Sequence, residues 1–261
     1  MRTFAIVNRK GGVGKTTTAV NLAYVLATSC RMRVLLIDAD SQENASSIST
    51  RGSGSGMADL LRFGDTDYYQ KYIEETDVPN LDLMPAGEDL DVLDLECMCG
   101  KRKANNWILR GFLDSLEEDD AYDVAVIDCP PYFSLSCLNA ITAADRLIIP
   151  AGPDAYSAVG MSGLDRKIEQ IRVACPCVSV SGCLVTQWTR SRQTEDAVDF
   201  LREEGPVHIF NTVIRSSTEK VREATWARQA TAQYSPFCNT SRDYRAWVRE
   251  LLDWEGMSDG K

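Results

Sequence analysis

A glycine-rich stretch near the N-terminus, Lys10-Gly11-Gly12-Val13-Gly14-Lys15-Thr16-Thr17, carries the residue types that bind nucleotide phosphates. Glycines allow backbone N–H groups to turn inward around phosphate oxygens, and the start of a following helix adds a favourable dipole. Lys15 can then reach the β- and γ-phosphates, and the Thr16 hydroxyl can ligate magnesium. The stretch departs from the P-loop pattern G-x4-G-K-[ST], because Arg9 stands where the first glycine is expected. It predicts a nucleotide-binding loop of an unusual kind.

Two groups of carboxylates agree with this interpretation. Asp38 and Asp40 follow the apolar run 34–37, and Asp128 follows the apolar run 124–127. A hydrophobic strand that ends in an aspartate is typical of the Walker B element, whose carboxylate accepts hydrogen bonds from the ligand shell of magnesium. Another acid can orient the attacking water. Each aspartate alone is also compatible with a helix cap or a solvated loop. Three of them at strand ends beside a P-loop favour a nucleotide site.

Short apolar runs alternate with longer amphipathic segments, the pattern of a parallel sheet built from βαβ units. The sequence predicts an α/β fold: a single doubly wound, mostly parallel sheet with helices on both faces, in one domain over residues 1–261, of which about 254–261 form a disordered tail. Residues 41–56 and 64–80 are expected to be surface loops. We expect strands near 2–8, 33–38, 81–85, 123–128, 145–150, 178–186 and 207–210. We expect helices near 15–28, 88–96, 104–117, 134–142, 157–173, 193–203, 217–225 and 241–253.

The composition is that of an ordinary globular protein, with 44% hydrophobic and 25% charged residues among 261. No apolar run approaches the roughly 20 residues that a membrane span needs. Because a strand is expected from residue 2, we expect neither a secretory leader nor a preceding helix-turn-helix domain. Nine cysteines without a C-x2-C pair, and a single histidine, favour reduced thiols over a metal site.

Charge is distributed unevenly along the chain. The formal net charge is −10, but residues 59–123 hold 18 acids against 6 bases, so the remainder carries 20 acids and 22 bases. Seven Lys and Arg against three acids stand between Arg215 and Arg249. A protein that coats nucleic acid with its whole surface is excluded, whereas a local basic face near the C-terminus is not.

Longer segments resemble a known family: LLIDADSQENAS over 35–46, YDVAVIDCPP over 122–131, AADRLIIP over 143–150 and HIFNTVI over 208–214. With the extra lysine Lys10, they are similar to the ParA/Soj partition ATPases, within the deviant Walker A group that also holds MinD. The resemblance runs from Met1 to about Leu252. It is most specific in the first 45 residues and around Asp128.

The resemblance implies an Mg²⁺-dependent ATP hydrolase and a role for each motif residue. Lys10 would reach across a nucleotide-sandwich homodimer to the partner's phosphates, Lys15 would contact its own ATP, and Asp40 would position the hydrolytic water. These three are the expected catalytic residues. The expected metal ligands are Thr16, Asp38 and Asp128. The expected ATP-binding residues are Lys10, Gly11, Gly12, Val13, Gly14, Lys15, Thr16, Thr17 and, toward the adenine, Asn211.

The resemblance also implies partners: a homodimer formed on ATP, non-specific DNA, and a ParB-like DNA-bound protein that stimulates hydrolysis. The expected DNA-binding residues are Arg215, Lys220 and Arg222, with Arg190 or Arg192 as further candidates, because phosphate contacts need only positive charge at a suitable spacing. A solvated helix face is the alternative interpretation of that segment. The chain departs from the family at Ser41 and Glu43, where proline and glycine are usual, and Glu43 places a charge near the dimer-facing loop.

Two classes of function remain open at this stage. One is an ATP-dependent DNA partition protein, cytoplasmic and nucleoid-associated. The other is a cytosolic positioning or regulatory ATPase that acts on a protein complex without binding DNA. Residues 250–261 carry four acids and one base, which weighs against a basic membrane-targeting helix of the MinD kind.

Overall fold

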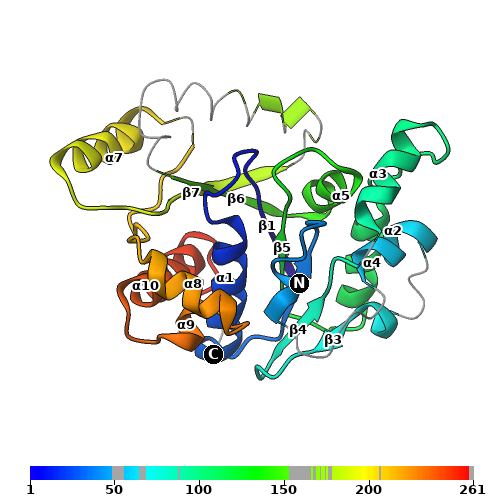
Figure 1. Cartoon of the computed structure of the whole chain (residues 1–261), viewed down its shortest axis with the longest axis horizontal. Coiled ribbons are helices and arrows are strands. Elements are labelled where there is room, and N and C mark those ends of the chain that lie inside the picture. The colour runs from blue at the N-terminus through cyan, green and yellow to red at the C-terminus, as the bar shows by residue number, and fades with distance from the viewer. Residues whose placement is uncertain are drawn as a thin grey trace.

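The computed structural model is built on a seven-stranded sheet with helices on both sides (Figure 1). The strands are β1 (Arg2–Ile6), β2 (Val34–Asp38), β3 (Glu74–Glu75), β4 (Leu81–Met84), β5 (Val124–Asp128), β6 (Arg146–Ala151) and β7 (Ser179–Val185). Their order is β3-β4-β2-β5-β1-β6-β7, and every pairing is parallel except that of β3 with β4. The structure describes residues 1–48, 56–64, 69–87, 89–152, 166, 169–170, 172–173, 175, 178–205 and 207–258.

Nine α-helices lie within these described residues, together with the 3-10 turns η1 (Ser46–Ile48) and η2 (Tyr69–Tyr72). The helices are α1 (Lys15–Ser29), α2 (Met57–Phe63), α3 (Leu90–Met98), α4 (Ile108–Glu118), α5 (Leu135–Ala143), α7 (Arg192–Glu204), α8 (Thr218–Trp226), α9 (Thr231–Tyr234) and α10 (Asn239–Trp254). None of the described helices is long and apolar enough to cross a membrane.

The sheet separates two hydrophobic cores, because successive side chains of a strand point to opposite faces. In β1, Ala5 joins the core beneath α2, α3, α4 and α5, whereas Phe4 and Ile6 join the core beneath α1 and α10. The central strands β2 and β5 are buried at every position. Coverage of both faces explains their continuous hydrophobicity and confirms the expected fold class.

The elements differ from the sequence-based prediction in several places, and one prediction falls largely outside the described residues. The expected strand at 207–210 is reduced to a bridge between Ile209 and Cys183. The regions expected to be loops, 41–56 and 64–80, contain η1, η2 and β3. Helices α2 and α9 were not expected, and both are too short to show a helical period. The expected helix at 157–173 lies largely outside the described residues.

Residues 254–258, expected to belong to a disordered tail over 254–261, pack against the rest of the chain. Helix α10 runs to Trp254, and Glu255 pairs with Arg146 at 2.9 Å and accepts a hydrogen bond from Ser181 Oγ at 2.6 Å. Met257 packs against the core. Residues 254–258 are therefore part of the domain, and the remaining positions, 259–261, lie outside the described residues.

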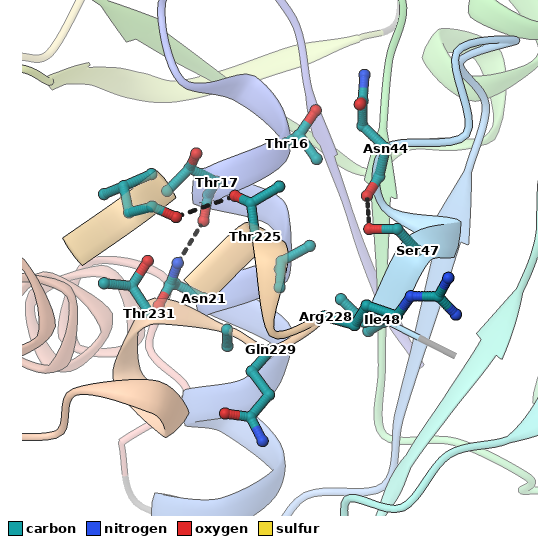
Figure 2. A pocket seen from close by; sticks show the side chains of 13 residues that line it. Thr16, Thr17, Asn21, Asn44, Ser47, Ile48, Thr225, Arg228, Gln229 and Thr231 are labelled. Atoms are coloured by element: carbon teal, nitrogen blue, oxygen red, sulfur yellow. Dashed lines mark hydrogen bonds between the residues drawn. The ribbon is translucent and has the colours of Figure 1, made fainter. Parts of the chain in front are cut away.

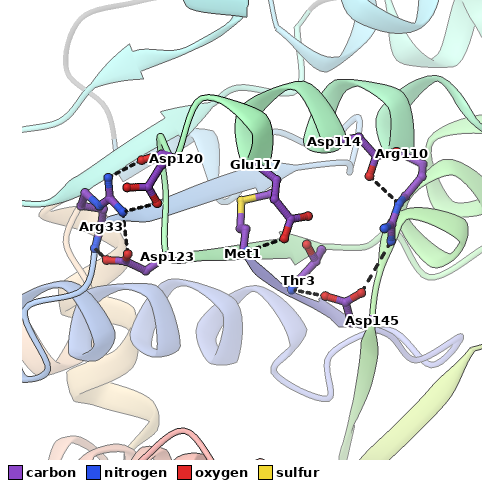
Figure 3. A network of polar contacts seen from close by, with 9 residues as sticks. All are labelled: Met1, Thr3, Arg33, Arg110, Asp114, Glu117, Asp120, Asp123 and Asp145. Carbon is purple, nitrogen blue, oxygen red and sulfur yellow. Dashed lines mark hydrogen bonds and ion pairs between the residues drawn. The ribbon is translucent and has the colours of Figure 1, made fainter. Parts of the chain in front are cut away.

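A network of charges joins the amino ends of the central strands (Figure 3). Before β2, the Arg33 guanidinium lies 3.0 Å from Asp120 Oδ1 and 2.8 Å from Asp123 Oδ1. At the start of β1, the amino group of Met1 lies 2.8 Å from Glu117. These contacts tie the start of the sheet to the end of α4.

Candidate active site

The phosphate-binding loop follows β1 and ends at the first turn of α1, as predicted. Gly12 and Gly14 have φ angles of 72° and 84°. This left-handed conformation favours glycine, because a Cβ atom would strain it. No side chain caps the N-terminus of α1. The first N–H groups of the helix thus remain available to an anion.

The end of β7 holds this loop in place, a role that sequence reasoning did not assign. Thr186 Oγ1 donates a hydrogen bond to Val13 O at 2.9 Å, and Gln187 Nε2 donates one to Gly12 O at 2.5 Å. Gln187 has a φ of 55°, an unusual value for a residue with a side chain. Backbone strain of this kind is found where a site is positioned.

Lys15 is buried at the start of α1, and its Nζ donates to Lys10 O over 3.4 Å. Close to it, at the end of β5, Asp128 has no exposed surface. Within the described residues neither carboxylate oxygen of Asp128 has a hydrogen-bond partner. Burial, and after it the charge of Asp38, raises the pKa of Asp128 well above its usual value, while Thr16 and Lys15 act in the opposite direction. A buried carboxylate with no hydrogen-bond partner is costly, and Lys15 and Thr16 offset only part of the burial, so this end of the sheet is suited to a further cation.

Asp38 differs from Asp128, although both end neighbouring strands. Its Oδ1 accepts from the backbone N–H of Asp40, and its Oδ2 accepts from both the N–H and the hydroxyl of Ser46, at 2.7 and 2.8 Å. Burial raises the pKa of Asp38 to about 6, against the lowering effect of these bonds. Asp38 therefore shapes the loop after β2. This contact also explains why η1 forms inside an expected loop.

Asp40 lies on that loop, buried to 6% exposure, and its Oδ1 accepts a hydrogen bond from the N–H of Gln42 at 3.1 Å. The structure thus brings Lys15, Thr16, Asp38, Asp40 and Asp128 to one edge of the sheet, as predicted. Lys10 lies on the exposed side of the phosphate loop, where its backbone N–H donates to Asn8 Oδ1. Its place at the surface suits contact with a second molecule.

The residues around Asp128 fit magnesium. Hydroxyl and carboxylate oxygens are the ligands that Mg²⁺ prefers, and it is commonly bound by one or two protein groups together with phosphates and water. Among the described residues there is no group of three His, Cys, Asp or Glu placed to enclose a metal alone. Thr16 and Asp128 would therefore hold a cation only together with a nucleotide.

A cavity of about 530 Å³ extends from the phosphate loop. Its lining includes Gly14 and Thr17 of the loop and Gln187 after β7. The wall opposite is formed by 214–218 and by α8, with the exposed Trp226 at its edge. The volume suits a nucleoside.

Asn211, expected near the adenine, does not line this cavity. Its N–H donates to Glu250, and its carbonyl accepts from Arg202 Nη2 at 2.8 Å. The segment that does face the cavity begins three residues later, at Ile214. A short motif such as HIFNTVI cannot reveal which of its residues turns toward the ligand.

A second, smaller cavity of about 210 Å³ lies on the other side of α8 (Figure 2). On one side it is lined by Thr16, Thr17 and Asn21 of α1, and on the other by Asn44 and Ser47, which follow β2. Arg228 and Gln229 also line it. Within it Asn21 donates to Thr17 O at 2.7 Å, and Ser47 donates to Asn44 O at 2.7 Å. The loop that carries Asp40 thus faces α8 across an open gap.

The three expected DNA-binding residues lie around α8 but differ in their partners. Arg215 contacts both carboxylate oxygens of Asp243, with Nη2 at 2.6 Å from Oδ1, and also lines the larger cavity. Lys220 pairs with Glu223 at 2.8 Å. Arg222 is exposed. Arg190 and Arg192 are exposed and face Glu195 and Asp196.

Comparisons with known proteins agree with the sequence and the fold. Residues 1–176 match the model of an AAA domain family. The chromosome partitioning protein ParA of Caulobacter vibrioides is 33% identical over 264 residues, which cover 98% of this chain and 95% of that protein. The chromosome-partitioning ATPase Soj of Thermus thermophilus is 32% identical, with 97% and 96% covered.

Solved structures show the same fold. McdA of Cyanothece superposes with a TM-score of 0.77 at 25% identity and covers 97% of this chain and 99% of that one. The septum site-determining protein MinD of Pyrococcus horikoshii, in complex with Mg-ADP, gives a TM-score of 0.78 at 21% identity, with 100% and 99% covered.

Proposed function

Since the chain belongs to the ParA/Soj family of partition ATPases, we propose that it is an ATP-dependent DNA partition protein. ATP would drive the formation of a homodimer that holds DNA without sequence preference, and a ParB-like DNA-bound partner would stimulate hydrolysis and release. The observation that carries the ATPase chemistry is the buried Asp128 without a partner, beside Lys15 and Thr16.

The proposed catalytic roles follow from the geometry of the site. Lys15 would neutralise the phosphates of bound ATP, and Thr16 and Asp128 would hold Mg²⁺, with Asp38 ordering the loop that faces them. When bound, the metal neutralises charge that develops on the transferred phosphoryl group. Asp40 would orient the attacking water, because its loop is fixed by the hydrogen bonds to Asp38. The nucleoside would occupy the cavity between Gln187 and 214–218.

Lys10 supports the dimer in this proposal. It is exposed beside the phosphate loop, where its side chain can reach a second molecule. A nucleotide sandwich would place this charge on the phosphates of the facing subunit. Dimer formation would then depend on ATP and on Lys10.

For DNA binding we propose Arg215, Lys220 and Arg222, on a protein that acts in the cytoplasm at the nucleoid. Two of the three are paired with acids, so phosphate must compete with Asp243 and Glu223. The dimer doubles the number of contacts on one duplex, which offsets weak binding by one subunit. If about three bases per subunit contact phosphates, log affinity falls with log salt at a slope near −5.

A gel-shift or filter-binding titration with ATP and Mg²⁺, from about 50 to 200 mM salt, tests this proposal. Replacing Lys220 and Arg222 by alanine is expected to weaken binding to all sequences alike and to flatten the slope. Because Arg222 also lines the larger cavity, the ATP affinity of the variant is measured beside its DNA affinity. Lys101→Ala with Lys103→Ala removes the same charge from the loop between α3 and α4 and serves as the control. A shift of equal size in the control would contradict the assigned face.

A second function, a positioning ATPase that acts on a protein complex without DNA, is favoured by one observation. The pairing of Arg215 and Lys220 with acids leaves few free cations near α8 among the described residues. A wild-type ATP dimer that binds no DNA even at about 50 mM salt would establish this alternative, because electrostatic binding is strongest there.

A further inference from the structure

A groove of about 420 Å³ opens on the side of the molecule formed by α2, α4 and the start of α5. In Figure 1 these helices lie on the right, whereas α8 and α10 lie on the left. None of the proposed nucleotide or DNA contacts uses this groove. Its apolar lining is Leu61, Phe63, Trp107, Ile108 and Leu135.

Two aromatic side chains that line the groove are largely exposed to solvent. Phe63, at the end of α2, is 68% exposed, and Trp107, just before α4, is 60% exposed. Gly111, in the first turn of α4, also lines the groove, with nothing within 4 Å of the place a Cβ would take. A helical glycine costs about 1 kcal/mol relative to alanine, and it lets another chain approach the backbone closely. Paired aromatic anchors around such a floor are typical of protein-docking sites.

The charge of the groove is opposite to that of its surroundings. Of the 6 bases within residues 59–123, five lie in the two stretches 61–64 and 101–111, which contain no acid. Every charged residue that lines the groove is basic: Arg62, Arg102 and the exposed Lys103. Arg62 pairs with Asp89 and Arg102 pairs with Glu96, both at 3.1 Å. An acidic occupant would pair with Lys103 and compete with these two acids for the arginines.

The wall of the groove is already in place in the free protein. The buried Asn139 of α5 donates to Asn105 O at 2.9 Å and accepts from the N–H of Leu109 at 3.1 Å. These two bonds hold the loop before α4 on either side of Trp107. Binding therefore requires little ordering of the protein, which favours affinity.

The residue after Leu135, which lines the groove, contacts the loop that carries Asp40. Leu135 lines the groove, and the hydroxyl of the next residue, Ser136, donates to Ala39 O at 2.7 Å. Ala39 stands between Asp38 and Asp40. A shift at the start of α5 is transmitted to this loop through a buried hydrogen bond.

We propose that this groove docks an acidic segment of a protein partner, which inserts an aromatic or large aliphatic side chain beside Trp107. Through Ser136, docking changes the rate of ATP hydrolysis. That second step rests on the proposed ATPase function, whereas docking itself does not. The apolar lining favours a peptide over nucleic acid, because a phosphate backbone offers nothing to fill it.

The test begins with a display library of random 12-residue peptides, selected on the immobilised nucleotide-free full chain. The enriched peptides are expected to be acidic and to share an aromatic or large aliphatic residue. A labelled synthetic copy of the most enriched peptide is then titrated by fluorescence anisotropy. Lys103→Glu with Trp107→Ala is expected to weaken its binding at least tenfold. Both side chains are exposed, and a thermal melt confirms that the variant folds.

The matched control is Lys220→Glu with Trp226→Ala, which changes a half-buried lysine, paired with Glu223, and an exposed tryptophan on α8. The control is expected to bind the peptide like wild type. Neutral or basic consensus peptides, or equal affinity for the groove variant, would overturn the proposal. The proposal would also be overturned if wild type bound a 25-base-pair DNA duplex, or a second copy of this chain, and the groove variant did not.

The effect on hydrolysis is measured with ATP and the same peptide, without DNA. We expect the rate to change at least twofold in wild type and not at all in the groove variant. Peptide binding with no change in rate would overturn the coupling through Ser136. Because the anisotropy titration uses no nucleotide, its result is independent of whether the chain partitions DNA.

Discussion

The two ends of the central strands β1, β2 and β5 carry carboxylates in opposite circumstances. At the amino ends, Asp120, Asp123 and Glu117 are exposed or half-exposed and each lies within 3.0 Å of a cation (Figure 3). At the carboxyl ends, Asp38 and Asp128 are buried, and Asp128 has no hydrogen-bond partner among the described residues.

This difference separates a stabilising network from a binding site. Exposed pairs contribute modestly to stability and are satisfied within the protein. A buried acid without a partner costs free energy until something outside the chain binds it. The buried acids at the carboxyl end therefore lower the stability of the unliganded protein but allow binding. Substitutions there should impair binding or hydrolysis, whereas substitutions at the amino end should affect only stability.

The largest effect is expected for Lys15→Ala at the carboxyl end. Loss of this buried cation should weaken ATP binding at least a hundredfold, because backbone N–H groups alone cannot replace it. Isothermal titration with a non-hydrolysable ATP analogue measures the change, and Lys101→Ala is the exposed control. Unchanged affinity would refute the assigned phosphate site.

Asp40→Ala should leave ATP binding intact while hydrolysis falls about a hundredfold or more, the usual range for loss of a positioned base or water-orienting group. Single-turnover hydrolysis measures the rate, and sedimentation with ATP measures the dimer. A variant that no longer dimerises would show instead that Asp40 is structural.

Lys10→Ala should bind ATP nearly as wild type but dimerise at least tenfold more weakly. Its charge is proposed to act on the facing subunit's nucleotide, so one subunit alone does not need it. Sedimentation velocity over a range of protein concentrations with an ATP analogue measures this. Dimerisation equal to wild type removes the role assigned to Lys10.

Asp128→Asn should stabilise the nucleotide-free protein by about 1 kcal/mol while abolishing Mg²⁺-dependent hydrolysis. The pKa of Asp128 is raised on folding, so the native state binds its proton more tightly than the unfolded state does. Its contribution to stability therefore falls as pH rises above the unfolded value of about 4. Asp38, with a pKa of about 6, acts in the same direction between about pH 4 and 6.

Urea unfolding at pH 4.5 and 7.5 measures this effect. The advantage of the asparagine variant over wild type should be larger at the higher pH. A variant that is less stable than wild type at both pH values would mean that Asp128 has a partner within the protein.

The smallest effect on ATPase activity is expected at the amino end, for Asp145→Ala. Asp145 accepts from the N–H of the buried Thr3 at 2.9 Å and faces Arg110 at 3.6 Å. Its loss leaves a buried donor unpaired and should cost about 1–2 kcal/mol, with the ATPase rate unchanged. Asp114→Ala, which removes only the exposed partner of Arg110, should cost less than about 0.5 kcal/mol. A fall in ATPase activity for Asp145→Ala would show that the two ends are coupled.

Local signals in the sequence predicted a glycine-rich loop between a strand and a helix and aspartates at strand ends, and the structure places these residues there. Glycines, Lys15 and Thr16 are contiguous, and each aspartate directly follows an apolar run, so no long-range information is needed. The fold class followed from the same alternation of runs. The edge strand β3 and helix α2 were missed, because elements of two and seven residues carry no measurable period.

The place proposed for the nucleoside depends on contacts between distant segments. Gln187 reaches the phosphate loop across 175 positions of the sequence, and no spacing rule relates the two. Asn211 belongs to a recognisable motif, but its backbone is held by Glu250 of α10, away from the larger cavity. Only the packing of α10 shows which residues of that segment face the ligand.

The amino-acid sequence by itself determined which chemistry this protein can perform, because phosphate and metal chemistry depend on residue types at short, fixed spacing. The tertiary structure alone decided which charges are satisfied: Arg215 and Lys220 look equally free in the sequence, yet both are paired with acids. It also decided that three bases and two aromatic residues from separate stretches of the chain line one groove. Burial and pairing are properties of the folded chain, since they arise only when residues far apart in sequence share one environment.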